Sequence, residues 1–358
     1  MYDLTSLGWG PFFAAAFERH EQEGLRPARV AVEHHGFYSL LTAEGDRGGI
    51  PSGRLKFEGE EPAVGDWVAV DELAGERKAV IHAVLPRRTK FSRKEPWKRT
   101  VEQVVAANVD VVFLVSGLGH DFNVRRLERY LTAAWSSGAE PVIVLTKADL
   151  VEPAESVLEA AEVAFGLPIH PISSVTGEGL DALEPYLSPG RTVALLGSSG
   201  VGKSTLVNRL LGSERLATAE LRADGRGRHT TTRRELVQLP GGALLLDTPG
   251  MRELQLWADE DALEGSFSDV AALAAECRFA DCGHEREPGC AIRAALADGR
   301  LSPERWDSHL RIQRELRALE VRQDARMTSE ARKERRRFAR AIRERGRIER
   351  EAARRRQR

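Results

Sequence analysis

Residues 194–206 read ALLGSSGVGKSTL, an apolar run followed by a glycine-rich turn and the start of a helical pattern. The stretch GSSGVGKS at 197–204 fits the pattern G-x-x-x-x-G-K-[ST], and the flanking strand and helix supply the context that a phosphate-binding loop requires. Gly197 and Gly202 let the backbone curl so that its N–H groups point toward phosphate oxygens. The N-terminus of the following helix adds positive potential there. These features predict a nucleotide-binding α/β domain.

Two side chains of this loop have roles that follow from their chemistry. Lys203 would reach the β- and γ-phosphates, and the hydroxyl of Ser204 would ligate Mg²⁺. Farther along, DTPG at 247–250 follows an apolar run, where Asp247 would hold Mg²⁺ and the N–H of Gly250 would approach the γ-phosphate. The loop residues predicted to bind the nucleotide are Gly197, Ser198, Ser199, Gly200, Val201, Gly202, Lys203, Ser204 and Thr205.

A second motif, TKAD at 146–149, ends the apolar run PVIVL and points to guanine. The carboxylate of Asp149 can accept two hydrogen bonds from guanine, whereas adenine offers no such pair and would leave the carboxylate unpaired. This argues against an ATP-driven RNA remodeller and makes GTP the predicted nucleotide. The stem of Lys147 can lie over the base, and ISS at 172–174 supplies a backbone N–H for guanine O6. The predicted guanine contacts are Thr146, Lys147, Ala148, Asp149, Ser173 and Ser174.

The guanine motif precedes the phosphate loop in this chain, which is the reverse of the order in most G-proteins. From residue 109 onward, short apolar runs alternate with helical stretches, a pattern that predicts a parallel sheet covered on both faces. Natural termini often lie close together in a domain, so joining them and cutting the chain elsewhere leaves the site intact. We therefore predict a circularly permuted GTPase domain over residues 101–258.

The N-terminal part has a different pattern. Segments 28–41, 52–57, 65–73 and 78–86 alternate apolar and polar residues between glycines and prolines, as strands do. About five strands in this length predict a small β-barrel of the oligonucleotide-binding (OB) kind, with an SH3-like barrel as the alternative. The basic segment 87–100 contains Phe91 and Trp97 and reads either as a solvated linker or as a nucleic-acid contact.

Charge is distributed unevenly along the 358 residues, although the formal net charge is only −1. Residues 331–358 carry 14 Lys and Arg against 4 Glu. Such a basic tail on an acidic body indicates a polyanionic partner, RNA above all, while a solvated tail without a specific partner is the alternative. No run of ~18 apolar residues exists, so we expect no membrane segment.

The chain has 3 cysteines, all within residues 277–290, which is not the composition of a disulfide framework. A reducing, cytoplasmic setting is therefore expected. Cys277, Cys282, His284 and Cys290 supply three thiolates and one imidazole, a set that completes a tetrahedral zinc site with no open position. Zinc would then be structural. The alternative is three reduced thiols in a core beside an unrelated histidine.

Taken together, several motifs resemble one family. The permuted order, GSSGVGKST, GRHTTT at 227–232, DTPG and CRFADCGHEREPGC at 277–290 are similar to the ribosome small-subunit-dependent GTPase A family (RsgA). The resemblance runs from about residue 28 to about residue 320. It implies an OB-like β-barrel, a permuted GTPase domain and an α-helical zinc-binding C-terminal domain. It also implies hydrolysis of GTP to GDP and phosphate, stimulated by the small ribosomal subunit and its rRNA during late subunit maturation. We expect a monomer.

The family's guanine motif usually begins with Asn, and Thr146 stands there in this chain. Threonine keeps a hydroxyl but lacks the amide, so weaker guanine affinity is expected. The predicted organisation is an N-terminal extension at 1–27, the barrel at 28–90, a basic linker at 91–100, the GTPase domain at 101–258, the zinc-binding domain at 259–326 and an Arg-rich tail at 327–358.

The residue that positions the attacking water is not obvious. Many small G-proteins place Gln directly after the glycine of DTPG, but Met251 is present here and cannot orient water. His229 offers a polar side chain for this role, which the resemblance supports once the ribosome orders its loop, and Thr230 or Thr231 would ligate Mg²⁺. The alternative is a non-hydrolysing GTP- or GDP-binding module that holds rRNA.

Overall fold

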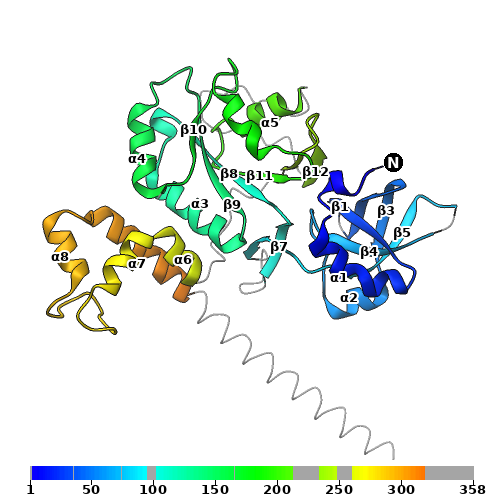
Figure 1. Cartoon of the computed structure of the whole chain (residues 1–358), viewed down its shortest axis with the longest axis horizontal. Helices are drawn as coiled ribbons and strands as arrows, with labels where there is room; N and C mark the ends of the chain where they lie inside the picture. The colour runs from blue at the N-terminus through cyan, green and yellow to red at the C-terminus, as the bar shows by residue number, and fades with distance from the viewer. Residues whose placement is uncertain are drawn as a thin grey trace, which may run out of the picture.

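The computed structural model describes residues 2–34, 36–73, 75–94, 102–164, 166–212, 234–247 and 260–318. These residues form a β-barrel, a central α/β domain and a helical C-terminal unit, which follow one another along the chain (Figure 1). No helix within these ranges is both long and apolar enough to cross a membrane.

The central domain is built on a mostly parallel sheet. Its strands are β8 (Val111–Gly117), β9 (Glu140–Thr146), β10 (Ile169–Pro171), β11 (Thr192–Leu196), β12 (Glu235–Gln238) and β13 (Leu244–Asp247). They lie in the order β10-β9-β8-β11-β13-β12, and only the pairing of β12 with β13 is antiparallel. The strand that leads into the phosphate loop thus lies at the middle of the sheet. This arrangement confirms the mostly parallel sheet that was predicted for the central domain.

Helices cover both faces of this sheet, as the apolar strands predicted. The helices are η2 (Gly119–Asp121), α3 (Val124–Ser137), α4 (Ala154–Ala164), η3 (Leu180–Tyr186) and α5 (Lys203–Leu211). Successive residues of β9 alternate between the two layers, with Ile143 in the core that includes Leu127 of α3 and Val144 in the core that includes Leu206 of α5. Both faces of β9 are therefore covered, one by the layer that contains α3 and the other by the layer that contains α5.

A five-stranded barrel precedes the central domain and confirms the OB-like prediction. Its elements are β1 (Arg26–His34), β2 (Phe37–Thr42), β3 (Gly45–Pro51), α2 (Gly53–Glu58), β4 (Trp67–Glu72) and β5 (Lys78–Val84). The order β1-β2-β3-β5-β4 closes through pairing of β1 with β4, and β3 runs parallel to β5. One predicted strand, 52–57, is wrong because this segment forms α2. Ser52 caps the helix by accepting the N–H of Leu55, and Gly59 ends it with φ of 74°.

Residues ahead of the barrel pack against it. They form η1 (Thr5–Leu7) and α1 (Pro11–Gln22), which bury Leu7, Phe13 and Phe17 in one core with Trp67 of β4. The ring centroids of Trp9 and Trp67 lie 4.7 Å apart. The barrel therefore has an additional layer that the alternating strand pattern did not reveal.

The segment after the barrel is partly a hairpin. Here β6 (Lys90–Lys94) pairs with β7 (Glu102–Ala107), and Phe91 is 2% exposed within the shared core. The expectation that Phe91 contacts nucleic acid or lies in a solvated linker is therefore wrong, because its ring packs inside the protein. Trp97 lies outside the described residues.

The barrel is joined to the central sheet by direct pairing. Val32 of β1 pairs with Glu235 of β12, so that the two sheets form one continuous eleven-stranded sheet. The guanidinium of Arg234 also pairs with the carboxylate of Glu33 at 3.2 Å. The strand β12 is thus shared between the GTPase domain and the barrel.

A buried arginine sits at this junction. The Arg29 guanidinium donates to the carbonyl oxygens of Leu7, Gly65 (3.4 Å) and Asn108 (3.2 Å), and to the hydroxyl of Thr192 (2.8 Å). Burial lowers the pKa of Arg29 to about 10, so the side chain stays charged at neutral pH. One cation therefore links the N-terminal segment, the barrel and the strand that leads to the phosphate loop.

The C-terminal unit contains α6 (Glu260–Ser266), α7 (Ser268–Ala275), α8 (Ala291–Asp298) and a helical stretch at 303–318. Its small core includes Leu263, Phe267 and Ile292. A buried ion pair connects this unit to the central domain, since Arg305 contacts Glu128 of α3 at 2.5 Å. Arg305 also pairs with Asp269 at 3.0 Å.

Candidate functional site

The phosphate loop connects β11 to α5 at the edge of the sheet where the parallel strands end. A Cβ at Gly197 would lie 2.3 Å from the carbonyl oxygen of Val115 on β8, so only glycine fits there. Gly202 has φ of 91°, a backbone conformation that favours glycine. The ammonium of Lys203 bonds the carbonyl oxygens of Gly197 at 2.7 Å and Ser198 at 2.5 Å. These contacts place the lysine at the mouth of the loop, where it would meet phosphate.

The guanine motif lies directly beside the phosphate loop. Thr146 ends β9, is 2% exposed, and donates its hydroxyl to the carbonyl oxygen of Val201 at 2.5 Å. The N–H of Ala148 bonds the carbonyl oxygen of Ile172 at 3.1 Å, which brings the predicted ISS segment to the same place. Three segments that are far apart in the sequence are therefore joined by two hydrogen bonds.

Other predicted guanine contacts surround this point. Lys147 has φ of 68°, and its ammonium pairs with Asp121 of η2 at 2.5 Å. The hydroxyl of Ser173 accepts the N–H groups of Val175 and Thr176, which fixes the turn after β10. Ser174 has a buried hydroxyl without a hydrogen-bond partner in the described part of the protein. Asp149 is exposed and free to receive a base.

Several predicted residues are not placed. Asp247 is the last residue of β13, where its backbone pairs with Glu235, but nothing is described of its side chain. The described residues do not include Gly250, His229, Thr230 or Thr231. Their predicted roles in hydrolysis and in Mg²⁺ binding stay predictions.

Two charged residues near the site were missed from the sequence. Arg126 donates to the hydroxyl of Ser198 at 3.0 Å, and Asp121 pairs with Lys147. Both belong to the segment that follows β8. No sequence motif marks these two residues. They could have been found only from the strand order, because β8 lies parallel to β11 and the segment that follows β8 begins at the same edge as the phosphate loop.

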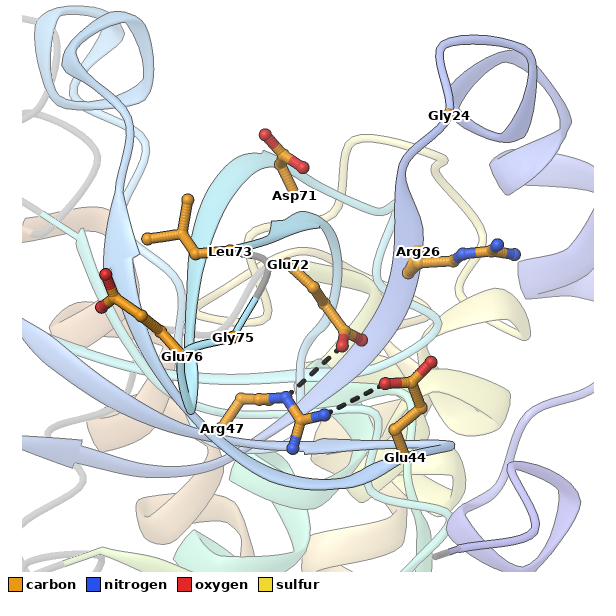
Figure 2. Close-up of a pocket in the computed structure, with 9 residues that line it drawn as sticks. All are labelled: Gly24, Arg26, Glu44, Arg47, Asp71, Glu72, Leu73, Gly75 and Glu76. Atoms are coloured by element: carbon orange, nitrogen blue, oxygen red, sulfur yellow. Dashed lines mark hydrogen bonds and ion pairs between the residues drawn. The ribbon is translucent and has the colours of Figure 1, made fainter.

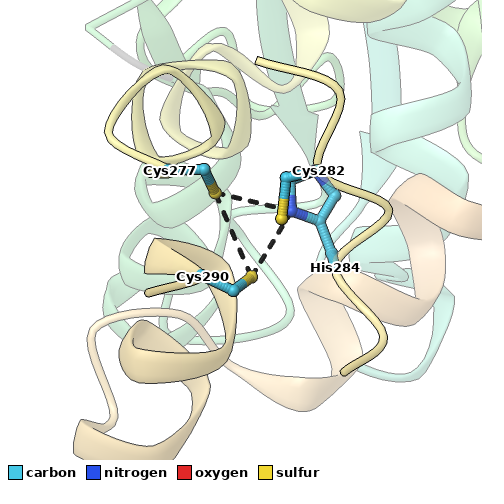
Figure 3. Close-up of side chains that lie close together, drawn as sticks. All are labelled: Cys277, Cys282, His284 and Cys290. Atoms are coloured by element: carbon cyan, nitrogen blue, oxygen red, sulfur yellow. Dashed lines mark hydrogen bonds between the residues drawn. The ribbon is translucent and has the colours of Figure 1, made fainter. Parts of the chain in front are cut away.

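The four predicted metal ligands form one cluster (Figure 3). The sulfurs of Cys277 and Cys290 lie 4.0 Å apart, and they lie 3.6 Å and 3.5 Å from Nδ1 of His284. Bond lengths in tetrahedral zinc sites imply ligand separations of about 3.5 to 3.8 Å. With Cys282 included, all four ligand atoms lie within 4.8 Å of one another. The geometry therefore fits a four-coordinate metal.

The surroundings of the thiols favour deprotonation at one of them. Partial burial acts to raise the pKa of Cys277, but the backbone N–H groups of Ala291 and Ile292 outweigh it and lower that pKa. These N–H groups belong to the first turn of α8, which favours anions. At Cys282 the N–H of His284 favours the thiolate, whereas burial and the neighbouring sulfurs raise the pKa to about 11. Binding of a cation here would therefore release a proton.

A polar pocket of 310 Å³ lies at one end of the barrel (Figure 2). Arg47 crosses it and pairs with Glu44 at 3.1 Å and with Glu72 at 3.4 Å. The other charged residues that line it are Arg26, Asp71 and Glu76. Because carboxylates outnumber guanidinium groups in this pocket, it is unsuited to phosphate and is not part of the nucleotide site.

Comparison with known families agrees with the geometry. The profile of the RsgA GTPase family matches residues 84–257. A second profile, described as ABC transporter, matches residues 180–348, a range that also contains the phosphate loop. Relatives that cover most of the chain agree with the first profile.

The small ribosomal subunit biogenesis GTPase RsgA of Opitutus terrae is 55% identical over 327 residues, which cover 87% of this chain and 89% of that protein. The corresponding protein RsgA 2 of Lactiplantibacillus plantarum is 48% identical over 87% of this chain and 90% of its own length.

Solved structures give the same result. The crystal structure of YjeQ from Thermotoga maritima superposes with a TM-score of 0.63 at 27% identity, covering 82% of this chain and 98% of that one. YloQ, a circularly permuted GTPase, shares the fold with a TM-score of 0.59 at 23% identity, covering 82% of this chain and 96% of that one. With its permuted strand order, its phosphate loop beside TKAD and relatives of this similarity, the chain belongs to the RsgA GTPase family.

Proposed function

We propose that this protein binds the small ribosomal subunit and hydrolyses GTP to GDP and phosphate during late maturation of that subunit. The observation that carries the nucleotide assignment is the bond between Thr146 and Val201, which joins the guanine motif to the phosphate loop. The subunit as partner is supported by the printed function of the relatives, small ribosomal subunit biogenesis. We further propose that the protein acts as a monomer in the cytoplasm.

In this proposal, separate residues bind guanine, the phosphates, Mg²⁺ and the attacking water. Asp149 and the backbone near Ser174 hold guanine, the N–H groups of the phosphate loop hold the phosphates, and Lys203 neutralises their charge. Mg²⁺ bound with GTP would be held by Ser204, Asp247 and one of the two threonines after His229. His229 positions the attacking water when the subunit is bound, which explains why Met251 is tolerated after the DTPG motif.

The Cys3His cluster holds one structural Zn²⁺ in this proposal. Three thiolates and an imidazole fill all four positions, so no coordination site is left for a substrate. The helices around the cluster, the barrel and the Arg-rich tail at 327–358 would contact rRNA, because the tail carries most of the excess positive charge. The domain limits stay those expected from the sequence, with the GTPase domain at 101–258.

The test is steady-state GTP turnover with and without purified small subunits, with His229→Ala measured beside the wild type. We expect large stimulation by the subunits and its loss in the variant, while GDP affinity stays the same. Stimulation that survives the substitution would remove His229 from the mechanism but keep the function. Tight GTP binding without turnover in either condition would contradict the enzyme and favour the non-hydrolysing rRNA-binding module.

A further inference from the structure

The first turn of α3 brings a guanidinium to the phosphate loop. Asn123 caps this helix, and its side-chain oxygen accepts the N–H of Arg126 at 2.9 Å. The side chain of Arg126 then reaches the hydroxyl of Ser198 at 3.0 Å. Ser198 is the second residue of the loop, and its carbonyl oxygen is bonded to the ammonium of Lys203 at 2.5 Å. Two cations therefore meet at one residue of the phosphate-binding loop.

In the described part of the chain, Arg126 has a hydrogen bond to Ser198 and no ion pair. Its side chain is exposed, and within the described residues no carboxylate pairs with it. By contrast, Arg129 on the next turn of the same helix pairs with Glu315. An exposed guanidinium that pairs with none of the described carboxylates would exchange only its bond to the Ser198 hydroxyl for a bond to an anion.

The backbone that carries Arg126 is held firmly. Two residues farther along α3, Glu128 is 3% exposed and accepts hydrogen bonds from Arg305 and Ser308 of the C-terminal unit. The N-terminal end of the same turn is fixed by the Asn123 cap. The helix is therefore anchored on both sides of Arg126, while the side chain of Arg126 itself is exposed.

A positive charge near the γ-phosphate can stabilise the transition state of GTP hydrolysis. The oxygen of water bonds to the γ-phosphorus while the bond to the oxygen that bridges the β- and γ-phosphates breaks. That oxygen leaves with the bonding electron pair as part of GDP, and the proton lost by the attacking water passes to the phosphate product. Negative charge grows on the bridging and γ-oxygens along the way, and an arginine supplied within the same chain can stabilise it.

We propose that Arg126 is a catalytic residue that places its guanidinium on the γ-phosphate and stabilises the transition state of hydrolysis. This inference rests on the proposed GTPase function and adds a second residue to it. His229 would position the water, and Arg126 would neutralise the charge that the reaction develops. A chain with Met251 in place of a water-orienting glutamine has particular need of such a residue.

The experiment compares Arg126→Ala and Arg126→Lys with Arg125→Ala, the neighbouring exposed arginine on the same turn. Single-turnover hydrolysis of GTP is measured with small subunits present, and GDP affinity is measured separately. We expect Arg126→Ala to slow hydrolysis about 100-fold and Arg126→Lys to restore part of the rate, since arginines in this role contribute at least that much. GDP affinity should change less than about threefold, and Arg125→Ala should behave as the wild type.

A second measurement separates charge stabilisation from ordering of the loop. GDP with aluminium fluoride imitates the phosphoryl group in flight, and Arg126→Ala should weaken its binding far more than that of GDP alone. Equal loss of both, or hydrolysis within threefold of the wild type, would overturn the inference while leaving the GTPase function intact. If the wild type itself does not turn over GTP, both proposals fail together.

Discussion

At the scale of single residues, Thr146 stands where the guanine motif usually has Asn, and its hydroxyl connects this motif to the phosphate loop. Its hydroxyl bonds the carbonyl oxygen of Val201 at 2.5 Å and lies 3.3 Å from that of Ser116. The threonine is almost completely buried, so the Val201 carbonyl has no ready access to water in its place. The side chain therefore fixes TKAD against the phosphate loop, and in the proposed function it would act on guanine through this contact.

Replacing this threonine tests that role. Thr146→Val keeps the shape of the side chain but leaves the Val201 carbonyl unpaired, which costs about 1–3 kcal/mol. We expect GDP affinity to fall about 10-fold. Without this hydrogen bond, TKAD and the phosphate loop are no longer held in the relative position that binds the nucleotide. Calorimetric titration with GDP is the measurement.

Thr42→Val is the matched control, since the buried Thr42 hydroxyl bonds the Gly45 carbonyl at 2.8 Å in the barrel, away from the nucleotide. Both variants should lose stability, and only Thr146→Val should lose GDP affinity. Equal affinities would mean that this bond supports the fold and nothing more.

The residues of the site differ in how readily the sequence reveals them. Gly197, Lys203 and Asp149 belong to short motifs whose spacing reflects a single local structure, so they were predicted from the sequence alone. Arg126 and Asp121 belong to no motif. Arg126 reaches a residue more than 70 positions away in the chain, and Asp121 reaches one more than 20 positions away. These contacts form only when the segments fold to the same edge of the sheet, so the spacing of residues in the sequence does not reveal them.

At the scale of elements, α8 and the metal ligands depend on one another. The helix begins directly after Cys290, and the N–H of Ala291 bonds the sulfur of Cys277 at 3.3 Å. Within the described residues the surrounding core is small, with eight buried apolar side chains besides Cys290. A bound metal would therefore contribute a large part of the stability of this unit.

Removal of the metal tests this dependence. We expect elemental analysis to find one zinc per chain. The zinc should be absent from Cys290→Ser and should be removed from the wild type by a chelator at neutral pH. Hydrogen exchange should then rise in residues 268–298 while β8 and β11 stay protected, because their core is separate. His170→Ala, which alters a histidine outside the cluster, should retain the zinc. Unchanged exchange in the metal-free protein would contradict a structural role.

Secondary structure was predicted well where patterns were long and less well where they were short. The alternation in 52–57 resembles a strand, but Ser52 and Gly59 supply a helix cap and a helix end that outweigh it. The basic segment 87–100, which contains Phe91, was interpreted as a solvated linker or a nucleic-acid contact. Pairing of β6 with β7 turns the ring of Phe91 inward, and that pairing depends on residues beyond the local segment.

At the scale of the whole molecule, α3 connects the central domain to the C-terminal unit through a buried network. Arg305 bonds Glu128, Asp269 and the carbonyl oxygen of Ser266, and its guanidinium lies 4.1 Å from the ring centroid of Phe267. A charge buried in this way is stabilising only while its partners remain.

Breaking the pair from one side should therefore be costly. We expect Arg305→Leu to lower the free energy of unfolding by about 3 kcal/mol, because Glu128 is left charged and buried. Adding Glu128→Leu should recover part of this loss. Denaturant titration followed by tryptophan fluorescence measures both.

Arg129→Leu serves as the control, since its pair with Glu315 is about 40% exposed on both sides. Its cost should stay below about 1 kcal/mol. If Arg305→Leu costs no more than this control, the buried network does not hold the two units together.

The arrangement of domains in space was the least predictable level. The sequence indicated a barrel and a GTPase domain, but not that Val32 would pair with Glu235 and merge their sheets. This pairing joins segments about 200 residues apart in the chain. It depends on which edge strands remain unpaired after the barrel and the central sheet have folded. The packing of Leu7, Phe13 and Phe17 against Trp67 depends on the same assembled surfaces.

The shared strand β12 also sets a limit on distance. Arg234, whose guanidinium pairs with Glu33 of the barrel, follows His229 by five residues in the chain. Five residues of extended backbone span at most about 18 Å. The length of the chain thus keeps the proposed catalytic histidine within about this distance of Arg234. A molecule bound beside Glu33 would therefore lie near the residue that is proposed to position the attacking water.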